Sequence, residues 1–309
     1  MIVCGVDVSK RRLDAHVAPS GAFESFDNDA AGIAALANFC GRQGVQLVAM
    51  EATGGYERQA FLLLWEAGIA CGLTNPRSVR RYAEAMGILE KTDRLDAGVI
   101  ARFAIAKDLK PTSPPTTAQQ RLNALVARLR QVTDDLTVQK QRRSSARNEE
   151  MITSINEVIA LLKRQARTLE GEIGSLIDDD PLWSQLDAAI RTKGLANRTV
   201  AWVLAELPEI GIYSNKAVVK LAGLAPIAHD SGTRAGKRHI RGGRAGIRSI
   251  LFLVADIVRR FDESLADFHR KLTAAGKPKM VVRIALARKL LVRLNAKARE
   301  AREQYALAT

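Results

Sequence analysis

Residues 2–8 read IVCGVDV, a run of apolar and β-branched residues that is typical of a buried strand. Two more short strands are predicted at 14–18 (DAHVA) and 22–28 (AFESFDN), separated by a Pro-Ser-Gly turn. The short spacing predicts that the three strands form an antiparallel meander. Asp7 lies inside the first strand with valine on either side, although burying a charge is costly unless it is paired or bound to a metal ion.

Helices and strands alternate after this meander. The predicted elements are a helix at 30–44, a strand at 45–50, a helix at 56–68, a strand at 69–74, a helix opened by Pro76, and a helix at 92–106 with Thr92 or Asp93 near its start. Strands that alternate with helices in this way predict a mixed sheet with helices on its faces. We therefore expect an α/β domain over residues 1–115.

A Pro- and Thr-rich segment at 111–117 marks a boundary, and residues 116–180 then follow a heptad pattern. This pattern predicts a helical coiled-coil connector: either a hairpin folded near 143–150 or a longer helix that pairs with another subunit. Two ordinary amphipathic helices packed on a domain are the alternative. The seam residues are Leu122, Leu125, Leu129, Val132, Leu136, Ile155, Ile159, Leu162, Ala166, Leu169, Ile173 and Leu176.

The charge of the chain is concentrated in its last part. The formal net charge is +14, and residues 181–309 hold 24 Lys and Arg against 10 Asp and Glu, whereas residues 1–110 and 111–180 are each neutral. We expect residues 181–309 to form a mainly α-helical basic domain. A basic domain attached to neutral ones favours a polyanionic partner, most often nucleic acid. The alternative is a basic, solvated surface without a specific partner.

Four carboxylates are candidates for one metal site. Besides Asp7, Glu51 directly follows a predicted strand, and Asp93 and Asp96 are three residues apart on one face of a predicted helix. Oxygen ligands of this kind bind hard divalent cations. Two such ions about 4 Å apart can assist phosphoryl transfer at both the attacking and the leaving oxygen. For each residue alone, a solvated surface acid remains the alternative.

The stretch HDSGTRAGKRHIRGGRAGIRS at 229–249 places a single hydroxyl, Ser231, at the head of a basic, glycine-rich loop. Its glycines allow close approach of the backbone to DNA, and its cations can neutralise phosphates. A serine is a weak nucleophile unless it is activated, so both a nucleophile and a phosphate-contacting turn remain open. The candidate phosphate contacts are Arg234, Lys237, Arg238, Arg241, Arg244 and Arg248.

Several stretches resemble the DEDD transposases of insertion-sequence family one-ten, which are related to the pilin-gene-inverting recombinases. They are GVDVSK, MEATGGYE, NPRSVRRYAEAMG, KTDRLDAGVIA, LAELPEIG, KLAGLAP, SGTRAGKRHIRGGRAGIRSIL and ARKLLVRLNAK. The resemblance implies an RNase H/RuvC-like fold for the first domain, and its carboxylate motif matches Asp7, Glu51, Asp93 and Asp96. The family's C-terminal serine matches Ser231.

The same resemblance implies a mechanism and partners. The family's serine is understood to attack a DNA phosphate, which leaves a 5′-phosphoserine link and a free 3′-OH. The family's carboxylates are understood to hold Mg²⁺, and we expect two ions at this site. The family is also thought to use a structured guide RNA encoded by the element. One departure is TKGLANRTVAW at 192–202, which lacks the proline of a PGIG-like hairpin found in relatives, so the resemblance does not extend a DNA-gripping hairpin to this segment.

Two alternatives to this RNA-guided serine recombinase stay open. One is a RuvC-like Holliday-junction nuclease that uses water as nucleophile and forms no covalent intermediate. The other is a nucleic-acid-binding protein without catalysis, in which Asp7→Asn would change nothing. We further expect a homodimer or tetramer, because recombination joins two duplexes. The three cysteines have no metal-ligand spacing, which predicts buried, reduced thiols in a cytoplasmic bacterial protein. The sequence has no apolar run of membrane-spanning length, so we expect no membrane span.

Overall fold

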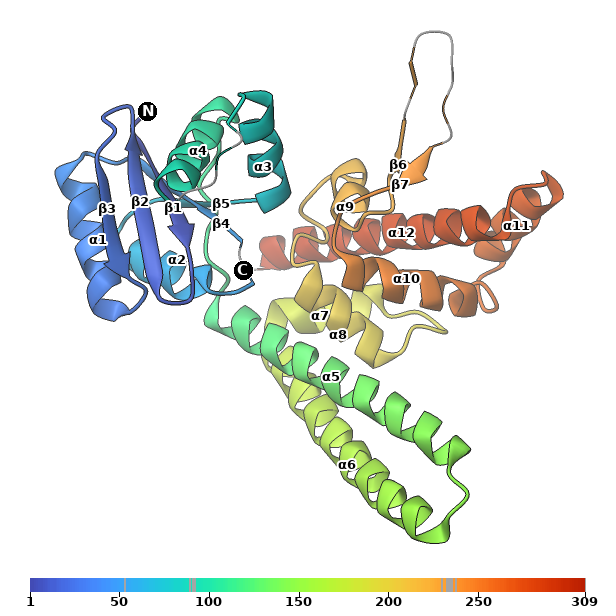
Figure 1. Cartoon of the computed structure of the whole chain (residues 1–309). Helices are drawn as coiled ribbons and strands as arrows, with labels where there is room; N and C mark the ends of the chain where they lie inside the picture. The colour runs from blue at the N-terminus through green and yellow to red at the C-terminus, as the bar shows by residue number, and fades with distance from the viewer. Residues whose placement is uncertain are drawn as a thin grey trace. The chain divides into compact units, whose positions relative to one another are not determined.

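The chain divides into two compact units, Met1–Pro115 and Thr116–Thr309, each with its own core (Figure 1). The computed structural model describes residues 1–52, 54–88, 90, 93–228, 230–231, 236 and 238–308, with the backbone alone for Asp93 and Arg94.

The first unit is built on a five-stranded mixed sheet in the order β3-β2-β1-β4-β5. The predicted meander is confirmed, since β1, β2 and β3 pair antiparallel, while β1 and β4 and then β4 and β5 pair parallel. The order of elements is the one implied by the resemblance to RNase H and RuvC folds. The strands are β1 Val3–Val8, β2 Arg12–Ala18, β3 Phe23–Asp27, β4 Leu47–Glu51 and β5 Cys71–Thr74.

Helices cover both faces of this sheet, as the alternating pattern predicts. Apolar residues of α1 and α2 pack on one face, and those of α3 and α4 pack on the other. The helix opened by Pro76 is confirmed, with the Asn75 side chain accepting a hydrogen bond from the Arg77 N–H as its N-cap. The helices are α1 Ala30–Arg42, α2 Glu57–Glu66, α3 Pro76–Ala85 and α4 Asp93–Ala106.

Alternate side chains of β1 lie on opposite faces of the sheet, because successive side chains of a strand point in opposite directions. Val6 packs in the core beneath α1 and α2, whereas Val3 packs with α3 and α4. Asp7 has the same parity as Val3 and therefore lies on the face that α3 and α4 cover. The three cysteines are free and buried, as predicted, and burial raises the pKa of the Cys71 thiol to about 12.

Helix α4 lies unusually close to β1, because Gly5 has no side chain. A β-carbon at Gly5 would lie 2.1 Å from the Ala97 carbonyl oxygen and 2.4 Å from the Ala101 nitrogen, both backbone atoms of α4. The helix could accept a side chain there only by moving away from the sheet. Gly5 therefore sets how deeply α4, and Asp96 on it, approaches β1.

We expect Gly5→Ala to destabilise the first unit by about 3 kcal/mol, the upper end of overpacking costs. Urea unfolding of the full chain, followed by a signal from the first unit, measures this loss. Gly41→Ala is the matched control, because a β-carbon at this exposed position of α1 meets nothing within 4 Å. It should be neutral or slightly stabilising. Equal stability of the two variants would contradict the close packing of α4.

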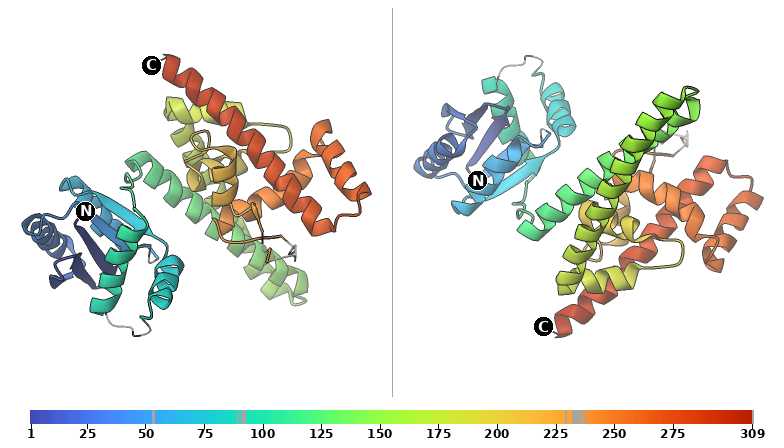
Figure 2. Two further views of the ribbon diagram at one scale, coloured as in Figure 1. Left: turned by 90° about the horizontal axis from the view of Figure 1, so that it is seen from above. Right: turned by 90° about the horizontal axis from the view of Figure 1, so that it is seen from below.

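The second unit begins with two long helices, α5 Thr117–Ser145 and α6 Glu149–Asp179, which lie side by side (Figures 1 and 2). Every predicted seam residue from Leu122 to Leu176 is buried or half-buried. The chain turns back at residues 146–148, so the hairpin is the arrangement that the structure has. Leu122, Val126 and Ile173 belong to the same core as α7 to α12, so residues 116–180 share one unit with residues 181–309.

In its described residues, the rest of the second unit consists of helices, their connecting loops and one small two-stranded sheet, which the sequence did not predict. The central element is α12, on which α7, α9, α10 and α11 pack (Figure 2). The bounds are α7 Pro181–Ile190, α8 Asn197–Glu206, α9 Asn215–Leu221, β6 Pro226–Ile227, β7 His239–Ile240, α10 Ala245–Val258, α11 Glu263–Ala274 and α12 Lys279–Ala308.

Candidate active site

Asp7 and Glu51 are brought together by the pairing of two parallel strands. Val6 of β1 is paired with Met50 of β4. The residues that follow them, Asp7 and Glu51, therefore lie side by side near the carboxyl ends of the two strands. Registered residues point to the same face, so both carboxylates face the side of the sheet that α3 and α4 cover. Both side chains are half-buried.

Asp96 completes a set of three carboxylates that line one cavity. The cavity has a volume of about 320 Å³ and is lined by Asp7, Glu51 and Asp96, with residues of α3 on its other side. Each carboxylate comes from a different element: β1, β4 and α4. The remaining lining residues are Pro76, Val79, Arg80, Ala83 and Val99.

Asp93 is the first residue of α4 and lies three residues before Asp96. Its side chain lies outside the described part of the structure, as do Lys91 and Thr92. Among the described residues, no group of three or more His, Cys, Asp or Glu side chains is arranged as a preformed metal site. The donor set that lines the cavity is nevertheless made of carboxylate oxygens, which are the ligands that Mg²⁺ takes from proteins.

Asp14 is a further carboxylate on this face that the sequence analysis missed. It is the cross-strand partner of Asp7 in the β1–β2 register and is only 7% exposed. The Ser25 hydroxyl on β3 donates a hydrogen bond to its Oδ1. Its position in a predicted strand gave no signal by itself, because only the pairing register places Asp14 opposite Asp7.

Ser231 lies between β6 and β7 in the second unit and is exposed. Strands β6 and β7 pair antiparallel, with Ile227 opposite His239 (Figure 1). Next to the serine, Asp230 Oδ1 accepts a hydrogen bond of 2.9 Å from the Gly236 N–H, and Asp230 Oδ2 lies 4.0 Å from Arg238 Nη2. The described contacts of Asp230 thus tie it to the residues that lead into β7.

The six predicted phosphate contacts differ in their surroundings. Arg238 and Arg241 are exposed, whereas Arg234 and Lys237 lie outside the described residues. Arg248 Nη1 donates a hydrogen bond of 2.6 Å to the Gly242 carbonyl and so braces the chain just after β7. Among the residues that the structure describes, Arg238 and Arg241 are therefore the cations of the set best exposed for a phosphate.

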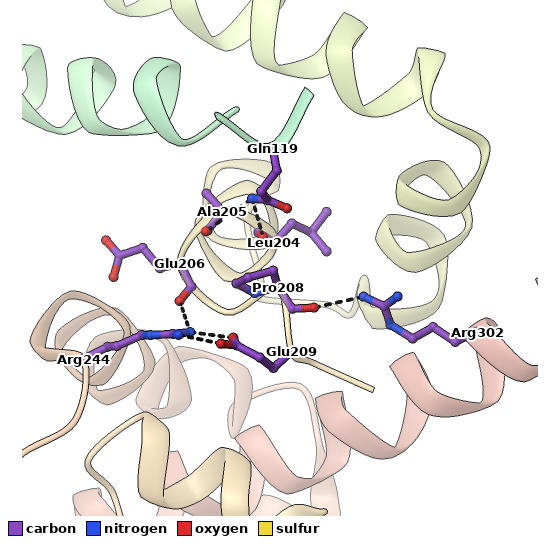
Figure 3. A network of polar contacts seen from close by, with 8 residues as sticks. All are labelled: Gln119, Leu204, Ala205, Glu206, Pro208, Glu209, Arg244 and Arg302. Atoms are coloured by element: carbon purple, nitrogen blue, oxygen red, sulfur yellow. Dashed lines mark hydrogen bonds and ion pairs between the residues drawn. The ribbon is translucent and has the colours of Figure 1, made fainter. Parts of the chain in front are cut away.

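Arg244 is hydrogen-bonded to other residues of the second unit (Figure 3). Its two terminal nitrogens bind the two carboxylate oxygens of Glu209 at 2.6 and 2.5 Å, and Nη1 also donates to the Glu206 carbonyl at 2.7 Å. This bidentate pair joins the start of α10 to the segment after α8. These hydrogen bonds give Arg244 a structural role that requires no contact to DNA.

Burial alone would raise the pKa of Glu209, but the hydrogen bonds and charge of Arg244 outweigh it and hold this pKa below its ordinary value of 4.5. A carboxyl whose pKa falls on folding stabilises the protein above pH 4.5 and loses that contribution as the pH falls further. We expect Glu209→Gln to cost about 1–2 kcal/mol near neutral pH, because both partners are partly exposed. Thermal unfolding should show the gap from wild type narrowing below pH 4.5.

The matched control for this prediction is Glu263→Gln. Glu263 also pairs with an arginine, Arg270, but its side chain is 79% exposed, so the change should shift the unfolding temperature little at any pH. Equal effects of the two substitutions near neutral pH would contradict a structural role for the pair between Glu209 and Arg244.

The segment that departs from relatives, 192–202, joins α7 to α8. Gly194 has a φ of +87° and packs against α10, since a β-carbon there would lie 3.1 Å from Val258 Cα and 2.9 Å from the Phe261 ring. Arg198 in this segment pairs with Glu170 of α6. The described contacts of the segment are thus internal to the second unit.

Comparison with known proteins gives the family of this chain. A model described as Transposase, built on IS110 transposases with a DEDD motif, matches residues 4–147, and a model described as Transposase IS116/IS110/IS902 family matches residues 188–270. The chain belongs to the IS110 family of transposases. This confirms the resemblance to insertion-sequence family one-ten and identifies the chain as a DNA recombinase of the transposase class. The first match spans the four candidate carboxylates and the second spans Ser231.

Two relatives of the transposase are pilin gene-inverting proteins, from Moraxella lacunata and Moraxella bovis. Each is 26% identical over 300 residues, which cover 93% of this chain and 92% of the relative. Among solved structures, RuvC of Thermus thermophilus is similar at 18% identity with a TM-score of 0.28, covering 36% of this chain and all of RuvC. In the described part of the transposase, none of the helices combines the length and the apolar character needed to span a membrane.

Proposed function

We propose that this transposase cuts and rejoins DNA strands through a covalent link between Ser231 and a DNA phosphate, with Mg²⁺ held by carboxylates of the first unit. The observation that supports the proposal most is the cavity lined by Asp7, Glu51 and Asp96. The three acids come from three different elements, and their carboxylate oxygens are the ligands that Mg²⁺ takes from proteins. Asp93 is proposed as the fourth ligand.

The covalent step balances without an external energy source. The Ser231 Oγ attacks the phosphorus, the bond from Oγ to phosphorus forms, and the bond from phosphorus to the 3′ oxygen breaks. The hydroxyl proton ends on that oxygen, so one strand leaves with a 3′-OH while the other carries a 5′-phosphoserine. Attack by a 3′-OH of another strand reverses the step, so strand exchange needs no ATP.

The metal ion and two exposed arginines have separate roles in this step. When bound, Mg²⁺ would neutralise charge on the scissile phosphate and assist the attacking oxygen, in a site with two ions. Arg238 and Arg241, which are exposed beside Ser231, are proposed to hold neighbouring phosphates. The carboxylates and Ser231 belong to different units, so the reacting site is proposed to form from both units, of one chain or of two in a dimer or tetramer.

A structured guide RNA is proposed as the partner that selects DNA sites by base pairing. The support for it is the family membership together with the strongly basic residues 181–309. Delegating sequence recognition to RNA agrees with a chain whose sequence carries no zinc-finger pattern.

A trapping assay tests this function. Protein, Mg²⁺, the element's flanking RNA and junction DNA labelled at either end of one strand are incubated and run on a denaturing gel. A 5′-phosphoserine link predicts that the 3′ label travels with protein while the 5′ label appears on a free, shortened strand. Cleavage with both labels on free DNA would favour the alternative, a RuvC-like nuclease that uses water.

A further inference from the structure

A groove in the second unit lies between the base of the β6–β7 hairpin and helices α11 and α12. Its volume is about 570 Å³, within the range of about 300–1,000 Å³ in which proteins hold small ligands. Pro226 and Ile240 line it from the hairpin, Phe268 from α11, and Met280 and Ile284 from α12. No part of the candidate carboxylate site belongs to this groove.

The groove combines an apolar floor with a cationic rim. Arg238, Arg288 and Lys289 line it, and none of its lining residues is acidic. Lys289 Nζ is held 4.3 Å above the centre of the Phe268 ring, while Arg288 and Arg238 are exposed. This arrangement is complementary to a ligand with a flat apolar body and negative charge at its edge.

The mouth of the groove leaves apolar side chains in contact with water. Met280 is 60% exposed and Val281 is 52% exposed, although both line the groove. Burial of such side chains by a ligand is favourable, because it removes apolar surface from water. The groove is therefore suited to an apolar surface that arrives together with phosphates.

The groove shares its hairpin with the candidate nucleophile. Ser231 follows Ile227, the last residue of β6, by four residues, and four residues span at most roughly 14 Å. A DNA strand whose phosphate lies at Ser231 thus passes within a few nucleotides of Arg238, which lines the groove. Enzymes that modify a DNA base take that base out of the stack, and proteins that bind single strands stack unpaired bases on aromatic side chains.

We infer that this groove receives an unpaired nucleotide of the DNA strand that Ser231 attacks, with the base on the apolar floor and its phosphates at Arg238, Arg288 and Lys289. The inference rests on the proposed function, since it takes DNA at Ser231 as the substrate. The cationic rim favours a nucleotide over an apolar peptide, because Arg238, Arg288 and Lys289 line the groove and none of its lining residues is acidic.

Equilibrium binding tests the inference without chemistry. Full-length protein with Ser231→Ala is titrated into two duplexes of the same sequence, one fully paired and one with a single unpaired 2-aminopurine. We expect the unpaired duplex to bind about tenfold more tightly, and the fluorescence of its 2-aminopurine to rise as the base leaves the stack. The ratio of the two affinities cancels any general change in phosphate attraction.

Two matched substitutions then locate the effect. Met280→Asp should reduce the affinity ratio to near one, whereas Leu253→Asp should leave it unchanged, since Leu253 is an equally exposed apolar residue (59%) outside the groove. An unchanged ratio in Met280→Asp overturns the inference. Conversion of a dimer to a monomer by Met280→Asp also overturns it, because the groove would then be an interface between two copies of the chain.

The inference and the proposed function fail in distinguishable ways. Wild-type protein is assayed in parallel for protein-linked label with Mg²⁺. Label without any preference for the unpaired duplex leaves the proposed function intact and removes the inference. A preference that depends on Met280 without protein-linked label keeps the groove as a nucleotide site and removes the serine mechanism.

Discussion

Ser231→Ala is expected to abolish the protein–DNA link and to lower strand cleavage by at least about 10³-fold, because no other group replaces the attacking oxygen. DNA affinity should change by less than about twofold, since Ser231 is exposed and uncharged and most of the affinity comes from phosphate contacts. The trapping assay measures the link, and a filter or anisotropy titration measures the affinity. Loss of the link with retained affinity is the signature of a nucleophile.

Ser249→Ala is the matched control for this prediction. Ser249 is another exposed serine of the same basic segment, on α10, and its hydroxyl should be dispensable. Two results contradict the serine mechanism. One is protein-linked label that persists in Ser231→Ala. The other is cleavage at the wild-type rate without any link, which would identify water as the nucleophile and Ser231 as a phosphate contact.

Much of the first unit follows from sequence patterns because its elements carry local signals. IVCGVDV at residues 2–8 is apolar enough to be recognised as a buried strand, and Pro76 sets the start of α3. The heptad steps from Leu122 onward predict α5 and α6, since apolar residues at that spacing face one side of a helix. Their assignment to the same unit as α7–α12 depends on tertiary packing, which the pattern does not contain.

The candidate site was predictable only in part. Asp7 stands out because a charge inside an apolar strand is costly, and Glu51 because it ends a strand. Asp14 does not stand out, because its relation to Asp7 is created by the β1–β2 register. Arg244 was predicted to contact DNA because it lies in a run of cations. The structure instead pairs it with Glu209, which is 35 positions away in the sequence, so the pattern around Arg244 could not reveal this partner. Strands of two residues, such as β6 and β7, leave no periodic signal at all.

Asp7→Asn is expected to lower cleavage and link formation by at least about 10³-fold while the fold remains, because an amide keeps the shape of the side chain but removes the charge that a divalent cation requires. A second readout does not depend on catalysis. Mg²⁺ that binds only the folded site raises the unfolding temperature by mass action, so wild-type protein should be stabilised by added Mg²⁺ and Asp7→Asn should not be.

Asp27→Asn is the control for this change, because it removes one exposed carboxylate from the same sheet at a position outside the cavity. It should retain both cleavage and the stabilisation by Mg²⁺. Stabilisation of Asp7→Asn by Mg²⁺ to the wild-type extent would mean that the cation binds elsewhere.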